Sequence, residues 1–258
     1  MTSETSTASL ATSLLGLHRD PALLTVVNVW DSISATVVTD IPGTLALASA
    51  SHSIAASRGY EDGEKIPVDE MIEEVRRIVA ATSLPVTADL EGGYGDAAET
   101  VRKAIGVGVV GANIEDQLKP LAEAAAQVEA VMAAAAAEGV PDFVLNARTD
   151  AFVKGADNPL QEAVTRGKAF LDAGAPVVFV PAPLDEEAVA TLVDAFGPQR
   201  LTTIGLPGTP SLARLEELGV ARVSYGPMSQ RVALTALAEL VEAVHAGGGV
   251  PDTMRPLN

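Results

Sequence analysis

The chain alternates short apolar segments with longer segments of helical composition, and this alternation constrains the fold more than any other feature. Eight apolar or β-branched runs are each bounded by Gly, Pro, Asp or Asn. The predicted strands are Leu24–Trp30, Thr44–Ser49, Pro85–Glu91, Gly111–Asp116, Phe143–Thr149, Pro176–Ala182, Leu201–Gly205 and Arg222–Gly226. Strands that are apolar on both faces and alternate with helices are typical of a parallel sheet covered by helices.

The segments between the strands carry a helical period. In Val68–Thr82, the residues Met71, Val75 and Ile78 share one face, and charged residues occupy the other. The other predicted helices are Ala97–Val107, Leu121–Glu138, Pro159–Ala173, Asp185–Phe196, Pro210–Leu218 and Gln230–His245. Eight such units in roughly 250 residues predict an α/β fold, a closed (β/α)8 TIM barrel. No linker composition interrupts the chain, so we expect a single domain over residues 1–258.

Charge and composition exclude several classes of protein. The formal net charge of −17 argues against nucleic acid and anionic membranes as partners, because phosphate binding needs clustered Lys and Arg. The chain has no cysteine, which excludes disulfides, thiolate metal sites and cysteine nucleophiles. The first residues lack the basic start of a secretory signal, so we expect a cytoplasmic protein. His18 and His245 fall on the first and last predicted helices, where we expect surface positions.

Acidic residues close two neighbouring predicted strands. In a barrel of this kind, functional residues lie at the carboxyl ends of the strands. Asp89 and Glu91 alternate, so on an extended chain both carboxylates point to one face, about 7 Å apart. Glu115 closes the next strand and can reach the same space. Three converging acids repel one another unless a divalent cation neutralises them, and carboxylate oxygens suit Mg²⁺ or Mn²⁺.

Each of these residues also has a purely structural interpretation. Asp89 and Glu91 could cap the next helix or pair with a basic residue, but the glycines that begin at Gly92 let a ligand approach the backbone closely. Asp116 is expected to be an acid at the N-terminus of the following helix. Arg148 could pair with Asp150, or it could clamp a substrate carboxylate with its planar fork. Local sequence leaves both roles of Arg148 open.

Five motifs together resemble a known family. They are Asn28–Ala35 (NVWDSISA), Ala55–Gly63 (AASRGYEDG), Asp89–Gly95 (DLEGGYG), Asn113–Asp116 (NIED) and Asn146–Ala151 (NARTDA). In this order, they are similar to the motifs of the isocitrate lyase / phosphoenolpyruvate mutase superfamily. The similarity runs through most of the chain.

The resemblance implies a set of site residues. It implies Mg²⁺, with Asp89 as the inner ligand and with Glu91 and Glu115 acting largely through bound water. Asp62 would complete the acidic wall. Arg148 would steady the substrate anion, and Ser49 and Ser51, with the backbone near Gly92, would bind its carboxylate. On this basis we take Asp62, Arg148 and Glu115 as catalytic, and Asp89, Glu91 and Glu115 as metal ligands. The resemblance also implies a homotetramer or homodimer whose last helix is exchanged between subunits.

Departures from the family pattern narrow the expected reaction. Members that cleave isocitrate or methylisocitrate use a cysteine-containing loop, which this chain lacks, so it resembles the phosphonomutase-like subgroup without that loop. The loop after Asp116 carries Lys119 but not the Asn and Ser of the phosphonate-forming mutases. We therefore expect a Mg²⁺-dependent lyase or decarboxylase acting on a small 2-oxo or 2-hydroxy di-acid such as oxaloacetate, through a metal-stabilised enolate.

Two alternatives and one assignment stay open. One alternative is hydrolysis of phosphonopyruvate or mutase-type C–P chemistry, and the other is a protein that binds a metabolite through a metal without turnover. The proton donor could be Tyr94, Tyr225 or a metal-bound water.

Overall fold

The computed structural model describes residues 6–257, and its strands form one parallel sheet. The strands are β1 (Leu24–Val26), β2 (Asn28–Val29), β3 (Leu47–Ser49), β4 (Val86–Asp89), β5 (Gly111–Glu115), β6 (Val144–Arg148), β7 (Val177–Val180), β8 (Leu201–Ile204) and β9 (Arg222–Ser224). Their order is β1-β9-β8-β7-β6-β5-β4-β3-β2. Because β1 and β2 are separated only by Val27, the sheet curls into a ring. The predicted TIM barrel is confirmed.

The seam of the barrel lies within the first predicted strand, which is split rather than continuous. Leu24–Val26 pairs with β9, whereas Asn28 and Val29 pair with β3. Val27, between the two pieces, is 41% exposed. A closed sheet needs a stagger between its strands, so the strand at the seam meets its two neighbours at different heights. The prediction of one uninterrupted strand over Leu24–Trp30 is therefore wrong.

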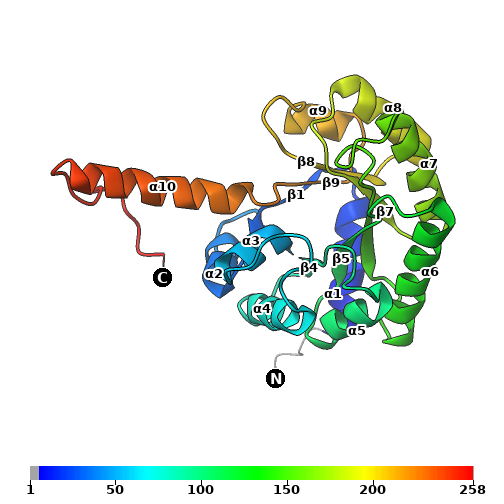
Figure 1. Ribbon diagram of the computed structural model, residues 1–258, viewed down its shortest axis with the longest axis horizontal. Helices are drawn as coiled ribbons and strands as arrows, with labels where there is room; N and C mark the ends of the chain where they lie inside the picture. The colour runs from blue at the N-terminus through cyan, green and yellow to red at the C-terminus, as the bar shows by residue number, and fades with distance from the viewer. Residues whose placement is uncertain (1–5, 258) are drawn as a thin grey trace.

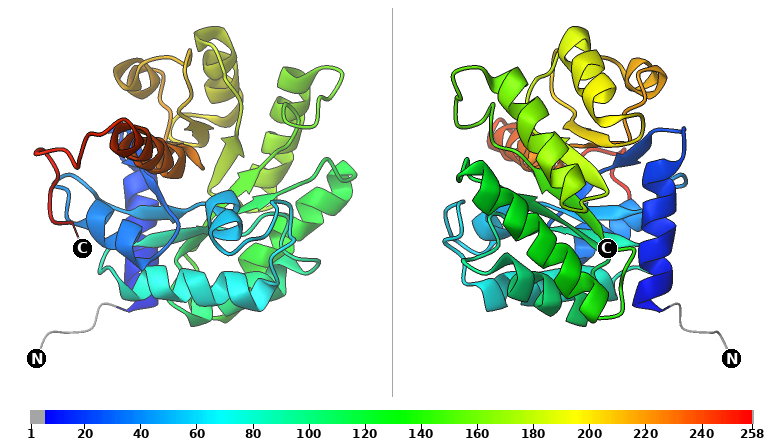
Figure 2. Two further views of the ribbon diagram at one scale, coloured as in Figure 1. Left: turned by 60° about the vertical axis from the view of Figure 1, so that its left-hand side comes forward. Right: turned by 90° about the vertical axis from the view of Figure 1, so that its right-hand side faces the viewer.

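Helices surround the ring of strands (Figure 1). They are α1 (Thr7–Arg19), α2 (Ser32–Thr39), α3 (Ser51–Ser57), α4 (Val68–Ala80), α5 (Ala97–Gly106), α6 (Leu121–Ala137), α7 (Pro159–Asp172), α8 (Glu186–Phe196), α9 (Leu212–Glu217) and α10 (Met228–His245). Figure 1 shows α10 extending away from the barrel, and Figure 2 shows the same barrel from two further sides. Among residues 6–257, no helix is long and apolar enough to cross a membrane.

Short polar side chains begin several of these helices. Asp31 accepts a hydrogen bond from the amide of Ser34, whose hydroxyl in turn accepts from the Asp31 amide, so α2 starts with a capping box. Asp96 caps α5 and Asp185 caps α8 in the same way, each through an amide of the first turn. These caps satisfy backbone donors that would otherwise lack partners. They set where each loop at the rim ends.

His18 corrects one expectation about the surface. It lies on α1 as predicted, but it is fully buried, and its Nδ1 lies 2.9 Å from the carbonyl oxygen of Leu14. The cause is that α1 packs against the barrel through the face that carries Ala11, Leu14 and His18. Burial, helped by the charge of Arg222, lowers the pKa of His18 to about 3. The imidazole is therefore neutral.

Candidate active site at the carboxyl ends of β4 to β6

Asp89 ends β4 and is held by two serines. The hydroxyl and the amide of Ser51 donate to Oδ2 of Asp89 at 2.8 and 3.1 Å. The hydroxyl oxygen of Ser49 accepts from the Asp89 amide at 3.0 Å. Both serines come from the end of β3 and the start of α3, beside β4 in the sheet. The two residues predicted to bind substrate thus orient Asp89 in this structure.

Glu91 sits in the turn that follows β4. Its backbone adopts φ 52°, in the left-handed region, and only 4% of the residue is exposed. Its carboxylate accepts hydrogen bonds from the Glu64 amide and, at 3.1 Å, from the Tyr94 hydroxyl. Burial raises the pKa of Glu91 to about 7, although both hydrogen bonds oppose the shift. The negative charges of nearby carboxylates add to it.

Glu115 and Arg148 face each other from the ends of β5 and β6. Nη1 of Arg148 lies 2.8 Å from Oε2 of Glu115, while Nε and Nη2 each lie 2.8 Å from Oδ1 of Asp150. Arg148 therefore pairs with Asp150, the first of the two roles that the sequence left open. The geometry also permits the second role, binding of a substrate carboxylate, because further N–H donors remain. Burial raises the pKa of Glu115 to about 7 even though the positive charge of Arg148 opposes the shift.

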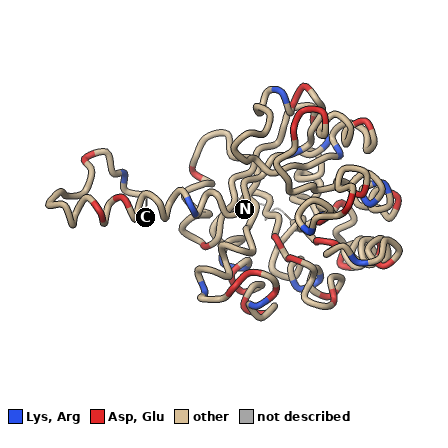
Figure 3. The backbone as a smooth tube through the Cα atoms, turned by 45° about the horizontal axis from the view of Figure 1, so that its top comes forward, with Lys and Arg blue, Asp and Glu red and all other residues tan. Residues whose placement is uncertain are grey.

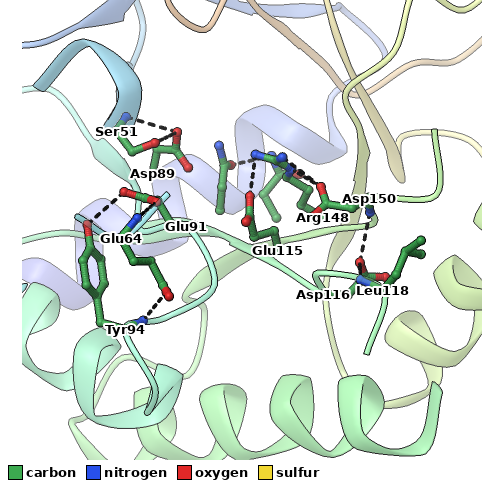
Figure 4. Close-up of polar contacts among 12 residues, drawn as sticks. Ser51, Glu64, Asp89, Glu91, Tyr94, Glu115, Asp116, Leu118, Arg148 and Asp150 are labelled. Atoms are coloured by element: carbon green, nitrogen blue, oxygen red, sulfur yellow. Dashed lines mark hydrogen bonds and ion pairs between the residues drawn. The ribbon is translucent and has the colours of Figure 1, made fainter. Parts of the chain in front are cut away.

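The acidic residues are close enough to sense one another (Figure 4). The charge of Asp89 raises the pKa of both Glu91 and Glu115, and Glu91 also acts on Glu115. Within residues 6–257, no three histidine or acidic side chains already stand as a group ready to hold a metal ion. All three carboxylates are engaged by neighbours instead: Asp89 by Ser51, Glu91 by the Glu64 amide and the Tyr94 hydroxyl, and Glu115 by Arg148.

Two other predicted site residues lie at the edge of this cluster. Asp62 is exposed on the loop between α3 and α4, and its charge contributes to the raised pKa of Glu91. Gly92 is buried, and a Cβ atom placed there would lie 2.3 Å from Nε2 of Gln117. A larger residue at this position would displace the flexible end of the Gln117 side chain, which crosses it. In this arrangement, Gln117 covers the part of the backbone that was predicted to meet substrate.

Asp116 corrects another expectation. It was predicted to be an acid at a helix N-terminus, yet α6 begins only at Leu121 and has Pro120 at its N-cap. Asp116 is instead 3% exposed and pairs with Arg166 of α7, its Oδ2 lying 3.1 Å from Nη1. A buried carboxylate needs a compensating charge, which the solvated start of a helix does not supply.

Sequence reasoning missed Glu64 and Arg222. Glu64 donates its amide to Glu91, and its carboxylate accepts from the Tyr94 amide at 2.6 Å. Its position in a charged loop gave no signal of this role. Arg222 on β9 is 1% exposed, and its three guanidinium nitrogens have no hydrogen-bond partner among the described residues. Burial lowers the pKa of Arg222 to about 10 against the opposing charge of Asp89, so the guanidinium remains charged near neutral pH.

The two tyrosines considered as proton donors are placed differently. The hydroxyl of Tyr94 donates to Glu91, and burial raises the pKa of Tyr94 well above its usual value. Tyr225 follows β9, its ring packs against Gly205, and it lines a cavity beside α10. Of the two, Tyr94 belongs to the acidic cluster.

The acids and the arginine gather at the carboxyl ends of neighbouring barrel strands, which is where the active sites of TIM-barrel enzymes lie. A model of the phosphoenolpyruvate phosphomutase family matches residues 14–245, so the chain belongs to this family, within the isocitrate lyase / phosphoenolpyruvate mutase superfamily.

Named relatives share most of the chain. The 2,3-dimethylmalate lyase of Eubacterium barkeri is 33% identical over 220 residues, covering 78% of this chain and 75% of the relative. An oxaloacetate decarboxylase of Paraburkholderia xenovorans is 29% identical over 240 residues, covering 87% and 78%. The crystal structure of a candidate phosphonomutase from Burkholderia cenocepacia superposes with a TM-score of 0.84 at 41% identity, covering 90% of this chain and 98% of that one.

Proposed function

We propose that this protein is a Mg²⁺-dependent carbon–carbon lyase or decarboxylase acting on a small 2-oxo or 2-hydroxy di-acid of the oxaloacetate type. The observation that carries the proposal is the cluster of Asp89, Glu91 and Glu115 beside a tethered arginine. Raised pKa values near 7 for Glu91 and Glu115 mean that the cluster gains charge close to neutral pH. The dimethylmalate lyase and oxaloacetate decarboxylase relatives support this class of reaction.

The donor set fits a hard divalent cation. Asp89, Glu91 and Glu115 offer only oxygen atoms, and mutual repulsion among them is the electrostatic situation that a cation relieves. We propose these three as the ligands of Mg²⁺, with Mn²⁺ as a substitute. When bound, the cation supplies positive charge for the negative charge that develops on the 2-oxo oxygen of the substrate.

Arg148 is proposed to bind the substrate carboxylate. A guanidinium carries five N–H donors, and the contacts to Glu115 and Asp150 use three of its N–H groups. Two donors therefore remain for an anion. Because Asp150 is 1% exposed and fixes Nε and Nη2, the guanidinium does not have to be ordered when substrate binds.

The remaining predicted residues shape the site around this pair. Ser49 and Ser51 keep Asp89 in place, and we propose that their backbone also meets the substrate carboxylate. Gly92 would join them where the flexible Gln117 side chain moves aside. We propose that Asp62, whose charge acts on Glu91, completes the acidic wall. Tyr94 stays protonated because of its raised pKa, so it can hold a proton next to Glu91.

Turnover of a panel of substrates tests the proposal. The purified protein is incubated with Mg²⁺ and oxaloacetate, a 2-hydroxy di-acid or phosphonopyruvate, and the release of pyruvate and phosphate is followed. Pyruvate from oxaloacetate without phosphate from phosphonopyruvate supports the lyase. Phosphate release would instead favour C–P chemistry, the alternative supported by the similar candidate phosphonomutase. Metal-dependent binding of oxalate without any product would identify a metabolite-binding protein.

We also propose that the protein is a homo-oligomer in which α10 packs on a neighbouring subunit. Val232, Leu234 and Leu237 of α10 are 71%, 55% and 55% exposed. Beside them lies a cavity of about 820 Å³ between α10 and the loop after β8. Apolar side chains exposed together in this way are typical of an interaction surface.

A further inference from the structure

Arg166 is a buried arginine on α7 that makes three contacts. The residue is 6% exposed. Its Nη1 donates to Oδ2 of Asp116 at 3.1 Å and to the carbonyl oxygen of Lys119 at 2.9 Å. Its Nε donates to Glu162, one turn earlier on the same helix, at 2.6 Å. The side chain therefore joins the outer helix α7 to the loop that follows β5.

Asp116 passes this contact on to two backbone segments. Its second oxygen, Oδ1, accepts from the Leu118 amide at 2.9 Å and from the Asp150 amide at 3.0 Å. The Asp116 amide donates to the Arg148 carbonyl oxygen at 3.0 Å. One buried carboxylate thus fixes both the start of the loop after β5 and the segment after β6.

The Asp150 side chain completes the connection to the site. Its Oδ1 holds Nε and Nη2 of Arg148, as described above. We propose that Arg166 is a positioning residue that fixes the orientation of Arg148 through Asp116 and Asp150. None of the hydrogen bonds of Arg166 described above reaches Arg148 directly, so the effect of Arg166 on Arg148 passes through this series of contacts. The inference rests on the proposed role of Arg148 in binding the substrate anion.

The same arginine anchors the loop that covers Gly92. Gln117 and Leu118 both adopt left-handed backbone conformations, with φ 52° and 53°. Such conformations cost free energy in residues other than glycine and persist only where surrounding contacts impose them. The bond from Arg166 to the Lys119 carbonyl and the bonds to Asp116 supply such contacts. Loss of Arg166 would therefore release the loop as well as Arg148.

Four proteins test this inference: the wild type, Arg166→Met, Arg166→Lys and Glu162→Gln. Glu162→Gln is the matched control, because it alters the contact of Arg166 that points away from the site. The first readout is hydrogen exchange of the Leu118 and Asp150 amides. The second is the binding of oxalate in the presence of Mg²⁺, measured by calorimetry, with kcat and KM for oxaloacetate determined in parallel.

We expect Arg166→Met to exchange the Leu118 and Asp150 amides at least tenfold faster, with α4 and α5 unchanged. Its affinity for oxalate should fall about 10- to 100-fold, the range found when an outer residue that orients a ligating group is removed. Arg166→Lys keeps the charge but not the planar fork, so it should fold and show a smaller change of the same sign. Mn²⁺ binding to the acidic cluster should be unchanged in both, which distinguishes lost positioning from general disruption.

The inference would be overturned if Arg166→Lys and Arg166→Met showed the same hydrogen exchange as the wild type and an oxalate affinity within twofold of it. The same holds if Glu162→Gln is as impaired as Arg166→Met. If the wild type itself neither binds oxalate nor turns over a di-acid, the proposed function fails. In that case, the exchange of Leu118 and Asp150 alone decides whether Arg166 orders the segment that carries Arg148.

Discussion

The rim formed by β4 to β6 and the side formed by β8, β9 and α10 are stabilised in opposite ways. On the first, carboxylates contact hydroxyls, arginines and backbone amides at 2.6 to 3.1 Å within a single chain. On the second, residues such as Leu206, Val223 and Val232 line the cavity beside α10. Figure 3 shows charged residues around the ring of helices and few of them along α10.

The two regions therefore lack different things. The acidic rim has its polar partners but carries more negative charge than its arginine balances, so a cation and an anionic substrate would complete it. The α10 side lacks apolar contacts rather than charge. Burial of apolar surface stabilises a protein by about 25 cal/mol per Å² of area removed from water. Contact with another protein surface would bury the exposed apolar side chains of α10 in this way. Function is therefore expected to depend strongly on substitutions at the rim and weakly on substitutions along α10.

The largest effect is expected for Asp89→Ala. A bound cation contributes several kcal/mol to the stabilisation of developing charge, so loss of the inner ligand should lower turnover by roughly 10³-fold or more. Affinity for Mn²⁺, measured by calorimetry, should fall with it. Asp69→Ala, which alters an exposed ion pair with Lys103, is the control and should behave as wild type. Full activity of Asp89→Ala would remove Asp89 from the site.

Arg148→Met is expected to lower kcat for oxaloacetate by roughly 10²- to 10³-fold, as when one preorganised donor to a developing charge is lost. The kcat of Arg148→Lys should lie between those of the wild type and Arg148→Met, because an ammonium cannot contact Glu115, Asp150 and a carboxylate together. Steady-state kinetics provide the measurement, and Arg214→Met, at an exposed ion pair, is the control. A pure rise in KM would show that the arginine binds the ground state and transition state equally.

Stability of the metal-free protein should fall as pH rises toward neutrality. Glu91 and Glu115 have pKa values near 7 in the folded state against 4.5 in the unfolded chain. Between these values the folded state holds protons that the unfolded state has released, so the stabilisation is complete below about pH 4.5 and is lost by about pH 7. A loss on the order of a few kcal/mol is expected.

Urea unfolding at pH 5, 6, 7 and 8 measures this dependence. Mg²⁺ should reduce the slope because it favours the ionised carboxylates, and Glu91→Gln should remove part of it. A profile that is flat without Mg²⁺ would contradict the electrostatic description of the rim.

The smallest effect on activity is expected for Val232→Glu combined with Leu237→Glu. If α10 packs on another subunit, light scattering should show a shift from an oligomer to a single chain while the acidic rim keeps its Mn²⁺ affinity. If α10 has no partner, surface substitutions should change the free energy of unfolding by no more than about 0.5 kcal/mol. Unchanged mass would then show that the two sides of the molecule differ in composition alone.

Much of the barrel could be predicted from the sequence because its signals are local. Apolar runs such as Val177–Val180 are buried on both faces, and Gly, Pro and Asp mark their ends. Some observed strands are shorter than predicted because their last polar residue is not part of the regular ladder with the neighbouring strand. Glu91 is an example, because its backbone adopts a left-handed conformation after β4 has ended. The break at Val27 could not be predicted, because it arises from closure of the ring rather than from any residue in that run.

The same distinction between local signals and tertiary packing applies to the site. Proximity of Asp89 and Glu115 follows from their places at the ends of neighbouring strands, whereas Glu91 lies in a left-handed turn after β4 and not on the extended strand that was predicted. The roles of all three as metal ligands stay predictions. Arg166 lies 50 residues from Asp116, and Glu64 lies 27 residues from Glu91. Such pairings depend on how outer helices and loops pack, which periodicity does not report. The position of Arg222 in an apolar strand gave no sign that its charge would be buried within the influence of the Asp89 carboxylate.

The seam also governs where the last helix goes. Asn28 of β2 accepts from the amides of Tyr225 and Gly226 at 2.8 Å, and its own carbonyl accepts from the hydroxyl of Ser229 at 2.6 Å. These bonds set the angle at which the 18 residues of α10 depart. A helix of that length reaches about 27 Å, so a 10° change at its root would swing its tip by about 5 Å. One asparagine thus fixes the direction of a long helix. A substitution of Asn28 would change that direction, and with it the position of any surface that α10 contacts.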